Sequence, residues 1–454
     1  MNIAILGHGL EGQAVETYFK AHSSTDTPHN LTFFDHFEDY QIPSFHLENF
    51  DLVFRSPSVH PQFVLSPEDR GLSSNWTSIT NYFFQHCKAP IIGVTGTKGK
   101  GTTCSIITNL LRQFPERFEN IHLVGNIGTP AILELDKITE KDLVVYEMSS
   151  FQCWDLQKSP HVAVVLRIEP DHLDRHRDFE DYIAAKTNIV NFQTASDFCI
   201  YYANNPDSTK IGLKSAGHQV TYPIKTNRDK LNPLLDQLKV PGEHNRENAE
   251  AAILAVLDIL HLSLEELFRE EHKDVYQKFA HGLATFTGLP HRIQFVRELN
   301  HVRYYDDNYS SAFPAADVAI KAFEAYPTIL IAGGKDRHLD LSAMKQRFFT
   351  ANNLKKIILI GETRFALAEG EDPEKFILAE SLEDAVLYAK NYAENYAANL
   401  ESNYDLCIPS TPEAINNQSA KPVIVLMSPG AASFDMFKDF SDRGNQFQQI
   451  VKSF

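Results

Sequence analysis

The most informative residues of this chain are Gly93-Val94-Thr95-Gly96-Thr97-Lys98-Gly99-Lys100-Gly101-Thr102-Thr103, which follow the apolar run Ala89-Pro90-Ile91-Ile92. Glycines in such a turn let backbone N–H groups approach phosphate oxygens, and a lysine there reaches the terminal phosphates. The residues beyond the turn carry apolar side chains at helical spacing, namely Ile106, Ile107, Leu110 and Leu111. A strand, a glycine-rich loop and a helix in this order predict a binding site for nucleotide phosphates.

This loop departs from the strict P-loop pattern at two positions. Val94 stands where the first glycine belongs, and Gly101 stands where a Mg²⁺-binding hydroxyl follows the lysine. Gly93 and Thr102, each one residue away, could supply the missing groups. We interpret the loop as an ATP site. The alternative is a glycine-rich turn between a strand and a helix that binds no ligand.

Length and composition are those of a globular protein with several domains. The chain has 454 residues, of which 43% are hydrophobic and 22% are charged, and its formal net charge is −17. Such a length suggests roughly three domains, and the acidic balance argues against a surface for nucleic acid or anionic membrane. The 5 cysteines lack the paired spacing of a zinc site or a disulfide framework.

The sequence also lacks a signal-peptide pattern at its start and an apolar run long enough to span a membrane. We therefore expect a monomeric cytoplasmic enzyme whose partners are small molecules, with no nucleic-acid partner and no membrane insertion.

The N-terminal region begins with a second strand–glycine–helix pattern. Residues 2–6 are predicted as a buried strand, followed by the turn Gly7-His8-Gly9-Leu10-Glu11-Gly12 and a helix over residues 14–20. A second strand over residues 31–34 ends in Asp35, and an acid about 20 residues past the turn is typical of dinucleotide-binding units. The alternative is that these glycines serve only close packing of the helix against the strand.

Two further regions alternate apolar runs with helical patterns, which favours mostly parallel sheets covered by helices on both faces. The strand candidates of the middle region are residues 91–94, 143–146, 162–168 and 198–201. Those of the last region are residues 328–332, 356–360 and 423–427. The predicted fold class is α/β with three domains: a Rossmann-like domain over 1–88, a P-loop ATPase-like parallel sheet over 89–291 and a Rossmann-like domain over 292–454.

Acidic and histidine side chains follow two of the middle strands. Glu147 comes directly after residues 143–146, and His172 stands in Arg167-Ile168-Glu169-Pro170-Asp171-His172-Leu173-Asp174-Arg175-His176. Ligands collect at the carboxyl ends of parallel strands, where the P-loop also lies. Glu147 could therefore hold the Mg²⁺ that bridges nucleotide phosphates, and His172 could bind a second ion. The alternatives are an acid that ends a strand in solvent and a structural histidine.

Lys186 shares one helical stripe with the apolar side chains of Tyr182, Ile183, Ile189 and Val190. A lysine on such a stripe usually extends its ammonium group to water. Alternatively, burial lowers the pKa of the amine, which could then take up CO₂ and become a carbamate that binds Mg²⁺. Both interpretations are open from the sequence.

Several motifs occur in a fixed order over nearly the whole chain. They are Gly96–Thr103, Gly125-Asn126-Ile127-Gly128, Tyr146-Glu147-Met148-Ser149-Ser150, Asp171-His172-Leu173-Asp174-Arg175, Ala184-Ala185-Lys186 and Gly242-Glu243-His244-Asn245-Arg246-Glu247-Asn248. Their order resembles that of the Mur ligase family, the ATP-dependent amide ligases of peptidoglycan assembly. Two longer segments are similar to the glutamate-adding branch of that family, residues 285–292 (Thr-Phe-Thr-Gly-Leu-Pro-His-Arg) and residues 428–444.

The resemblance implies that the chain adds glutamate, with D-glutamate expected, to UDP-N-acetylmuramoyl-L-alanine through an acyl phosphate. The ATP phosphates would be bound by Gly96, Thr97, Lys98, Gly99, Lys100, Gly101 and Thr102. Further ATP contacts would come from Asn245, Asn248, Arg292 and Asp307. Two Mg²⁺ ions would be held, one by Thr102 and Glu147 and the other by His172 and a carbamylated Lys186. The catalytic residues would be Lys100, Glu147, His172 and Lys186.

The same resemblance implies two substrate sites. The UDP end of the muramoyl substrate would be held by Gly9, Leu10 and Asp35, and its peptide channel would be lined by Asn126, Ser149 and Gln152. The incoming glutamate would be bound by Ser311, Arg337, Ser433 and Phe440.

Two departures from the family pattern concern the glutamate site. Tyr309 stands where most glutamate-adding ligases carry a lysine, and Arg337 stands where a lysine commonly meets the side-chain carboxylate of glutamate. The forked guanidinium of Arg337 keeps the charge and suits a carboxylate. Tyr309 removes a cation, so the preference for D- or L-glutamate is open.

Three other functions are alternatives. The order Gly-Lys-Gly-Thr in the phosphate loop is closer to folylpolyglutamate synthase, a related ligase that adds glutamate to folate. An oxidoreductase could use Gly7–Gly12 for a nicotinamide cofactor, although this leaves the motifs after residue 90 without a role. A catalytically inactive, ligase-like binding protein is the third alternative.

Overall fold

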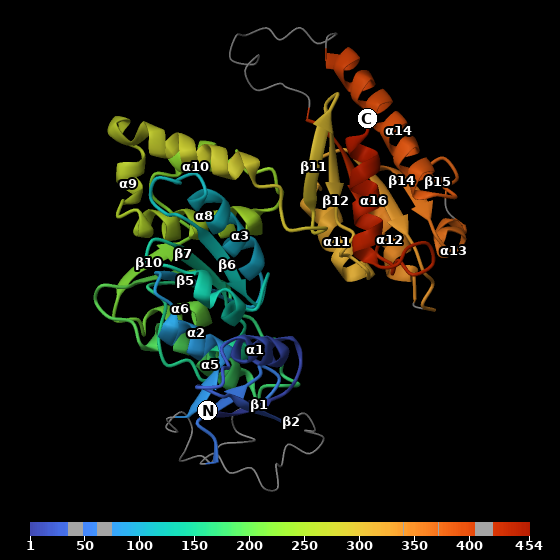
Figure 1. The fold of residues 1–454 in the computed structure, drawn as a ribbon. Helices are drawn as coiled ribbons and strands as arrows, with labels where there is room; N and C mark the ends of the chain where they lie inside the picture. The colour runs from blue at the N-terminus through green and yellow to red at the C-terminus, as the bar shows by residue number, and fades with distance from the viewer. Residues whose placement is uncertain (35–48, 61–74, 339, 371, 405–420) are drawn as a thin grey trace. The chain divides into compact units, whose positions relative to one another are not determined.

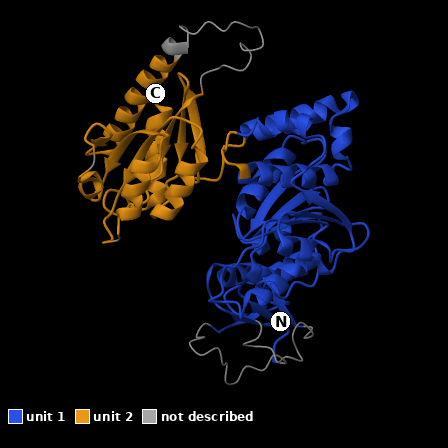
Figure 2. Cartoon of the chain, turned by 180° about the vertical axis from the view of Figure 1, so that it is seen from behind, with its two compact units in different colours: residues 1–238, 244–285 blue, residues 239–243, 286–454 orange. Residues whose placement is uncertain are grey.

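The computed structural model describes residues 1–34, 49–60, 75–338, 340–370, 372–404 and 421–454 (Figure 1). The chain forms two compact units (Figure 2), Met1–Leu238 with His244–Thr285 and Lys239–Glu243 with Phe286–Phe454. Two sheets belong to the first unit and one to the second. Within the described ranges, no helix combines the length and apolar character needed to cross a membrane.

The first sheet is parallel and has the strand order β2-β1-β3-β4. Its strands are β1 (Asn2–Leu6), β2 (Asn30–Phe34), β3 (Leu52–Arg55) and β4 (Trp76–Ser78), with helices α1 (Leu10–Ala21) and α2 (Ile79–His86). The turn after β1 needs glycine because a Cβ at Gly12 would lie 2.2 Å from the carbonyl oxygen of Gly7. Asp35, expected at the end of β2, lies outside the described residues.

The second sheet is also parallel and has the order β10-β9-β8-β5-β7-β6. Its strands are β5 (Ile91–Thr95), β6 (Ile121–Gly125), β7 (Leu143–Glu147), β8 (Val162–Val165), β9 (Phe198–Tyr202) and β10 (His218–Tyr222). Every residue of the central strands β5, β7 and β8 is buried, as expected for a parallel sheet with both faces covered.

Helices surround this second sheet. They are α3 (Lys100–Leu111), α4 (Ser150–Cys153), α5 (Phe179–Asn191), α6 (Pro206–Gly212), α7 (Arg228–Leu235), α8 (Glu243–Ile259), α9 (Leu264–Leu267) and α10 (Lys273–Thr285), with short 3₁₀ turns at Ala131–Leu133, Leu135–Lys137 and Glu270–His272. Helix α3 contacts β6 and β7 and is itself covered by α10, whereas α5 contacts β5, α4 and α6. The P-loop ATPase-like prediction is confirmed.

The second unit contains a sheet of order β11-β12-β16-β13-β14-β15, in which β11 runs antiparallel to β12 and the other neighbours are parallel. The strands are β11 (Gln294–Leu299), β12 (Val302–Asp306), β13 (Thr328–Gly333), β14 (Leu354–Ile360), β15 (Phe376–Leu378) and β16 (Val423–Met427). Its helices are α11 (Phe313–Ala322), α12 (Ser342–Thr350), α13 (Arg364–Ala368), α14 (Leu382–Tyr404) and α16 (Phe440–Lys452).

Two apolar clusters lie on the two faces of this sheet. One cluster contains side chains of α14 and α16, and the other contains side chains of α11 and α12 (Figure 1). The three sheets confirm the predicted α/β class with three domains. The first compact unit contains both the first and the second sheet, and its limits differ from the predicted domain limits. The domain boundaries at residues 88 and 291 therefore stay a prediction.

One predicted strand is shorter than the sequence-based expectation. The strand predicted over residues 162–168 ends at Val165, because the next residues turn toward the P-loop, where the N–H of Thr97 donates to the carbonyl of Arg167 at 2.9 Å.

A buried ion pair joins the first sheet to the second within the first unit. The guanidinium of Arg55, at the end of β3, donates to both carboxylate oxygens of Asp155 at 2.9 and 2.6 Å. It also donates to the carbonyl of Phe151, and Trp76 of β4 donates its indole N–H to Asp155 at 2.9 Å. A buried pair of this kind is costly to break, because the remaining charge has no partner.

We predict that Asp155→Asn destabilises the first unit by about 3–5 kcal/mol, because it leaves the buried guanidinium of Arg55 without an anion. Urea unfolding followed by circular dichroism measures the change. Asp236→Asn is the matched control, since it removes an exposed ion pair with Arg246 and should cost less than about 1 kcal/mol. Equal effects of the two substitutions would contradict the prediction.

Candidate active site

The phosphate loop lies between β5 and α3, as the sequence predicts. Gly99 caps α3 in the left-handed conformation, with φ of +86°. A Cβ at Gly99 would lie 2.6 Å from the amide oxygen of Asn248, so only glycine fits. This close approach brings Asn248 of α8 against the loop, with Asn245 one turn earlier, and both asparagines are buried.

Lys100 is the first residue of α3 and folds back over the loop. Its ammonium group donates to the carbonyl oxygens of Gly96 and Thr97, both at 3.0 Å. Burial lowers the pKa of Lys100, while the carboxylates of Glu147 and Asp171 act in the opposite direction. A phosphate group could replace these two carbonyls as the partner of the ammonium group, because a charged acceptor forms the stronger hydrogen bond.

Lys186 lies inside the protein, with only 1% of its surface exposed. Its amine donates to the carbonyl of Gly96 at 2.9 Å and to the hydroxyl of Thr95 at 3.2 Å, and it lies 4.7 Å from the ring centre of Tyr182. Burial, and next the charge of Lys100, lower its pKa to about 7. The amine therefore does not extend to water, and a large fraction of it is uncharged and nucleophilic at neutral pH.

Glu147 ends β7 and is buried beside the loop after β6. Its carboxylate accepts from the side-chain amide of Asn126 at 3.0 Å, and its carbonyl accepts from the N–H of Asn126 at 3.0 Å. Gly125 permits this approach, because a Cβ there would lie 2.2 Å from the Glu147 carbonyl. The structure therefore places the predicted metal ligand Glu147 and the predicted substrate residue Asn126 in direct contact.

Two more of the predicted channel residues follow β7. Ser149 caps the short helix α4 and forms a reciprocal capping box with Gln152. The amide of Gln152 also donates to the carboxylate of Glu11 in the first turn of α1 at 2.9 Å. Burial raises the pKa of Glu11, and the hydrogen bond from Gln152 opposes that rise. Gly9 and Leu10, predicted for the UDP end, lie exposed at the start of α1, where backbone N–H groups favour an anion.

The remaining predicted metal ligands are more accessible. His172 lies in a turn with φ of +53°, its side chain is half exposed, and its Nε2 is 3.6 Å from the carboxylate of Asp171. Thr102 lies in the first turn of α3 and is partly exposed. Hydroxyl, carboxylate and imidazole groups suit a Mg²⁺ site, so the donor chemistry fits the predicted ions.

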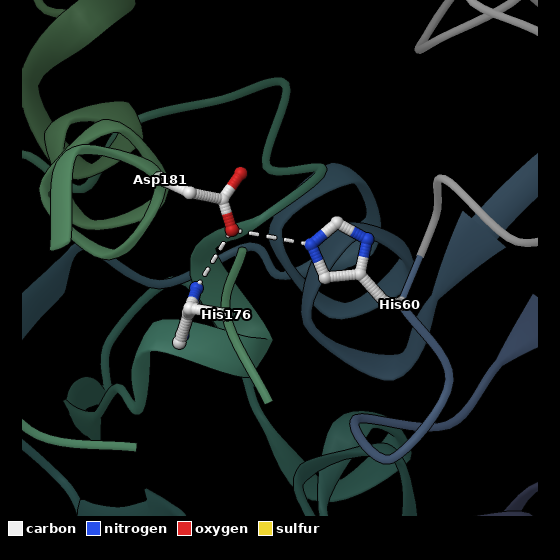
Figure 3. A group of neighbouring side chains, drawn as sticks. All are labelled: His60, His176 and Asp181. Atoms are coloured by element: carbon white, nitrogen blue, oxygen red, sulfur yellow. Dashed lines mark hydrogen bonds and ion pairs between the residues drawn. The ribbon is translucent and has the colours of Figure 1, made fainter. Parts of the chain in front are cut away.

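Another group of potential metal ligands lies closer together than the predicted metal ligands do. In the part of the chain that the structure describes, one set of three His, Cys, Asp or Glu side chains has its ligand atoms within 4.8 Å of one another, namely His60, His176 and Asp181 (Figure 3). None of the predicted metal ligands belongs to this set. Of the two histidines in the Arg167–His176 segment, the sequence analysis chose His172, whereas His176 is the buried one.

The second unit holds the predicted contacts of the C-terminal domain. Asp307 follows β12 and is buried, and its carboxylate accepts from the hydroxyls of Ser310 and Ser428 at 2.5 and 2.6 Å and from the N–H of Ile293. Burial raises the pKa of Asp307 to about 6, although the two hydroxyls oppose the rise.

Aromatic rings and a guanidinium group form a stack in the predicted glutamate site. The guanidinium of Arg292 lies over the ring of Tyr309, 3.9 Å from its centre, and the edge of Tyr309 meets Phe440 at 5.3 Å. Two of the other predicted glutamate ligands, Ser311 and Arg337, are exposed. The structure thus brings Arg292 and Phe440 together through Tyr309.

Arg443 was not predicted as a site residue from the sequence, although it holds two loops of the second unit together. Its fully buried guanidinium donates to the side chain of Asn308 at 2.7 Å and to the carbonyls of Ala431 and Ala432. It therefore joins the loop after β12 to the loop that carries Ser433, which is itself buried. The only sign of this role in the sequence was that Arg443 lies within residues 428–444, the long segment that is similar to the glutamate-adding branch.

Comparison with known proteins shows the family of this chain. The family model described as Mur ligase middle domain matches residues 94–256. A relative from Clostridium kluyveri, named UDP-N-acetylmuramoylalanine--D-glutamate ligase, is 33% identical over 426 residues, which cover 89% of this chain and 83% of that protein. A relative of the same name from Acetivibrio thermocellus is 33% identical over 440 residues, which cover 90% of this chain and 84% of that protein.

Two solved structures share the fold. MurF from Acinetobacter baumannii gives a TM-score of 0.52 at 15% identity and covers 90% of this chain and 89% of its own. The UDP-N-acetylmuramate-alanine ligase MurC from Thermotoga maritima gives a TM-score of 0.51 at 15% identity and covers 100% of this chain and 99% of its own. With relatives one-third identical over about nine-tenths of its length, the chain belongs to the Mur ligase family.

Proposed function

We propose that this Mur ligase joins glutamate to the terminal carboxyl group of UDP-N-acetylmuramoyl-L-alanine, with conversion of ATP to ADP and phosphate, in cytoplasmic peptidoglycan precursor synthesis. The observation that carries the proposal is that the amines of Lys100 and Lys186 both donate to the carbonyl of Gly96. The relatives of the chain carry the name of that ligase. We further propose that the protein acts as a cytoplasmic monomer on small molecules.

The reaction needs an activated carboxyl group, because a carboxylate is a poor acyl donor. Transfer of the γ-phosphoryl group of ATP to the alanine carboxylate gives an acyl phosphate and ADP. Lys100 would leave the carbonyls of Gly96 and Thr97 and neutralise charge on the transferring group. The amine of glutamate then attacks the acyl carbon, the C–N bond forms, the C–O bond to phosphate breaks, and the amine loses a proton.

Two Mg²⁺ ions are part of the proposal. Thr102 and Glu147 would hold one ion, and His172 with a carbamylated Lys186 would hold the other. When bound, these ions neutralise the oxygens of the phosphoryl group in transit. The uncharged fraction of the Lys186 amine can form a carbamate with CO₂, and the buried position of Lys186 protects that group from bulk water.

The substrates are placed by different parts of the chain in this proposal. Gly9, Leu10 and Asp35 would bind the UDP end, and Asn126, Ser149 and Gln152 would line the channel of the muramoyl peptide. Asn245, Asn248, Arg292 and Asp307 would contact ATP. The incoming glutamate would meet Ser311, Arg337, Ser433 and Phe440.

We predict phosphate release when the purified protein is incubated with ATP, Mg²⁺, UDP-N-acetylmuramoyl-L-alanine and D-glutamate. Parallel incubations with L-glutamate, and with a folate in place of the UDP substrate, identify the amino acid and the acceptor. The folate incubation is needed because the phosphate loop reads Gly-Lys-Gly-Thr, as in folylpolyglutamate synthase. Phosphate release with folate alone would overturn the proposed acceptor.

Lys100→Ala and Glu147→Ala should each lower the rate of ADP release by at least about 100-fold, because each removes a group that acts on the phosphoryl oxygens. Circular dichroism should show an unchanged fold. Lys88→Ala is the control, since Lys88 is exposed just before β5 and lies outside the proposed site. Near-normal turnover of either site variant would remove the phosphate-site assignment.

Lys186→Ala should abolish activity, and short carboxylic acids such as acetate should restore part of it. The small acid can enter the space of the missing side chain and replace the carbamate. Wild-type activity should also rise with added bicarbonate, more strongly at pH 8 than at pH 6, because the uncharged amine that forms the carbamate increases above a pKa of about 7. Activity of Lys186→Ala without added acid would contradict the carbamate.

A further inference from the structure

Three buried side chains form a hydrogen-bonded fork away from the proposed phosphate site (Figure 3). One carboxylate oxygen of Asp181 is 3.2 Å from Nε2 of His60 and 3.0 Å from Nδ1 of His176. The exposed fractions of His60, His176 and Asp181 are 6%, 3% and 9%. Hydrogen bonds to a buried carboxylate are strong and costly to lose, so this fork fixes the segments that carry it.

The fork joins the first sheet to the helix that carries Lys186. His60 belongs to the segment that follows β3 in the first sheet. Asp181 lies in the first turn of α5, and Lys186 follows five residues later, about one and a half turns along the same helix. The imidazole of His60 therefore contacts α5 directly, across the boundary between the first two sheets.

The segment that ends in His60 also packs on the proposed UDP site. The hydroxyl of Ser56 donates to the carbonyl of Gly7 at 2.7 Å, in the turn that leads to Gly9. A Cβ at Gly7 would lie 3.0 Å from the side chain of Ser56 and 3.4 Å from that of Ser58. Arg55 fixes the same segment by donating to the carbonyls of Ser56 and Val59. The Gly7–Gly12 turn is thus in direct contact with the segment that ends in His60.

Helix α5 carries these contacts onward to the phosphate loop. Tyr182, next to Asp181, packs its ring against His176 at 5.2 Å and shares a hydrogen bond with the hydroxyl of Thr97 at 2.9 Å. The same ring lies under the amine of Lys186. His176 also pairs with the hydroxyl of Ser150 at 2.9 Å. The start of α5 therefore connects His60 with both the phosphate loop and the end of β7.

The contacts of Asp181 favour a hydrogen-bonded fork over a metal site. Its second carboxylate oxygen accepts from the guanidinium of Arg177 at 3.1 and 2.9 Å. Burial alone would raise the pKa of Asp181, but the bonds from His176, Arg177 and His60 outweigh it and lower the pKa to about 2. The carboxylate is already satisfied, and a neighbouring guanidinium repels a second cation.

We infer that His60 is a positioning residue: it transmits occupancy of the UDP site to α5 and thereby sets the position of Lys186. This inference rests on the proposed function, because it needs the UDP-linked substrate to bind at the turn before α1. His60 touches neither substrate nor Mg²⁺ in this proposal. It acts through its hydrogen bond to Asp181, while its ring also packs against Trp154 at 4.0 Å.

The experiment compares two variants of similar size in the full-length protein. In His60→Gln, the amide N–H can reach the place of the imidazole Nε2, whereas in His60→Asn the amide is too short to reach Asp181. His161→Asn is the matched control, because His161 also pairs with an aspartate, the half-buried Asp197, at 2.9 Å but lies outside both proposed substrate sites. Hydrogen–deuterium exchange of residues 179–191 is measured with and without UDP-N-acetylmuramoyl-L-alanine.

In the wild type, His60→Gln and His161→Asn, the substrate should slow exchange of residues 179–191 by about tenfold, the factor that one strong hydrogen bond to a charged group supplies. In His60→Asn, the substrate should bind within about threefold of the wild-type affinity, yet the slowing in α5 should be lost. The kcat of His60→Asn should fall about tenfold, with the KM for ATP unchanged. A loss of stability alone would not remove a substrate-dependent signal.

Three outcomes would overturn the inference. The first is a rate of hydrogen–deuterium exchange in α5 of the wild type that does not change when the substrate binds. This outcome can be seen without any variant. The second is a response that persists in His60→Asn. The third is one equivalent of Zn²⁺ bound by the wild type and lost in both His60→Asn and His60→Gln, which would make the fork a metal site. A wild type that does not bind the UDP substrate at all would instead show that the proposed function is wrong.

Discussion

The amines of buried Lys186 and half-buried Lys100 share one carbonyl oxygen in the first unit, and the proposed chemistry depends on this contact. Lys100 and Lys186 both donate to Gly96, at 3.0 and 2.9 Å. Like charges this close repel each other strongly where water is excluded, and burial lowers the pKa of both amines. The arrangement becomes favourable when anions enter. The phosphates of a nucleotide would pair with Lys100, and conversion of the second amine into a carbamate would replace its positive charge by a negative one.

The position of Lys186 is set by long-range contacts rather than by α5 alone. Its amine donates to the hydroxyl of Thr95 and the carbonyl of Gly96, which lie about 90 residues earlier at the end of β5, and only the ring of Tyr182 comes from α5 itself. The first sheet contributes through the buried Arg55–Asp155 pair and through His60. The first two sheets therefore form one compact unit, although their sequence patterns are those of separate domains. In the second unit, Arg443 has the corresponding role, since its buried guanidinium joins two loops through neutral acceptors.

Local sequence patterns predicted the parts of the fold that have a local physical cause. The buried strands β1 and β16 have the predicted bounds, because each is a short apolar run that ends at a glycine-containing turn. The strands β6 and β10 were missed, since they lie at the two edges of their sheet, where β6 is mostly half-buried and β10 is largely exposed. Among the site residues, the sequence left undecided whether the amine of Lys186 extends to water or is buried. It did not single out Asp181 or Arg443. Their partners are 121 and 135 residues away, so no local pattern could reveal them.

The contact between Arg292 and Tyr309 bears on the departure from the family pattern at residue 309. A tyrosine in place of a lysine removes a positive charge from residue 309, but the guanidinium of Arg292 lies 3.9 Å above the tyrosine ring. A guanidinium can stack on an aromatic face and still direct its N–H groups in its own plane toward a carboxylate or a phosphate. Phe440 meets Tyr309 in a T-shaped contact at 5.3 Å, and Arg292 remains exposed. The substitution therefore does not leave the site without a cation. Arg292 belongs to the segment 285–292 that is similar to the glutamate-adding branch, so the ring of Tyr309 offers a packing surface to a guanidinium that this segment already supplies.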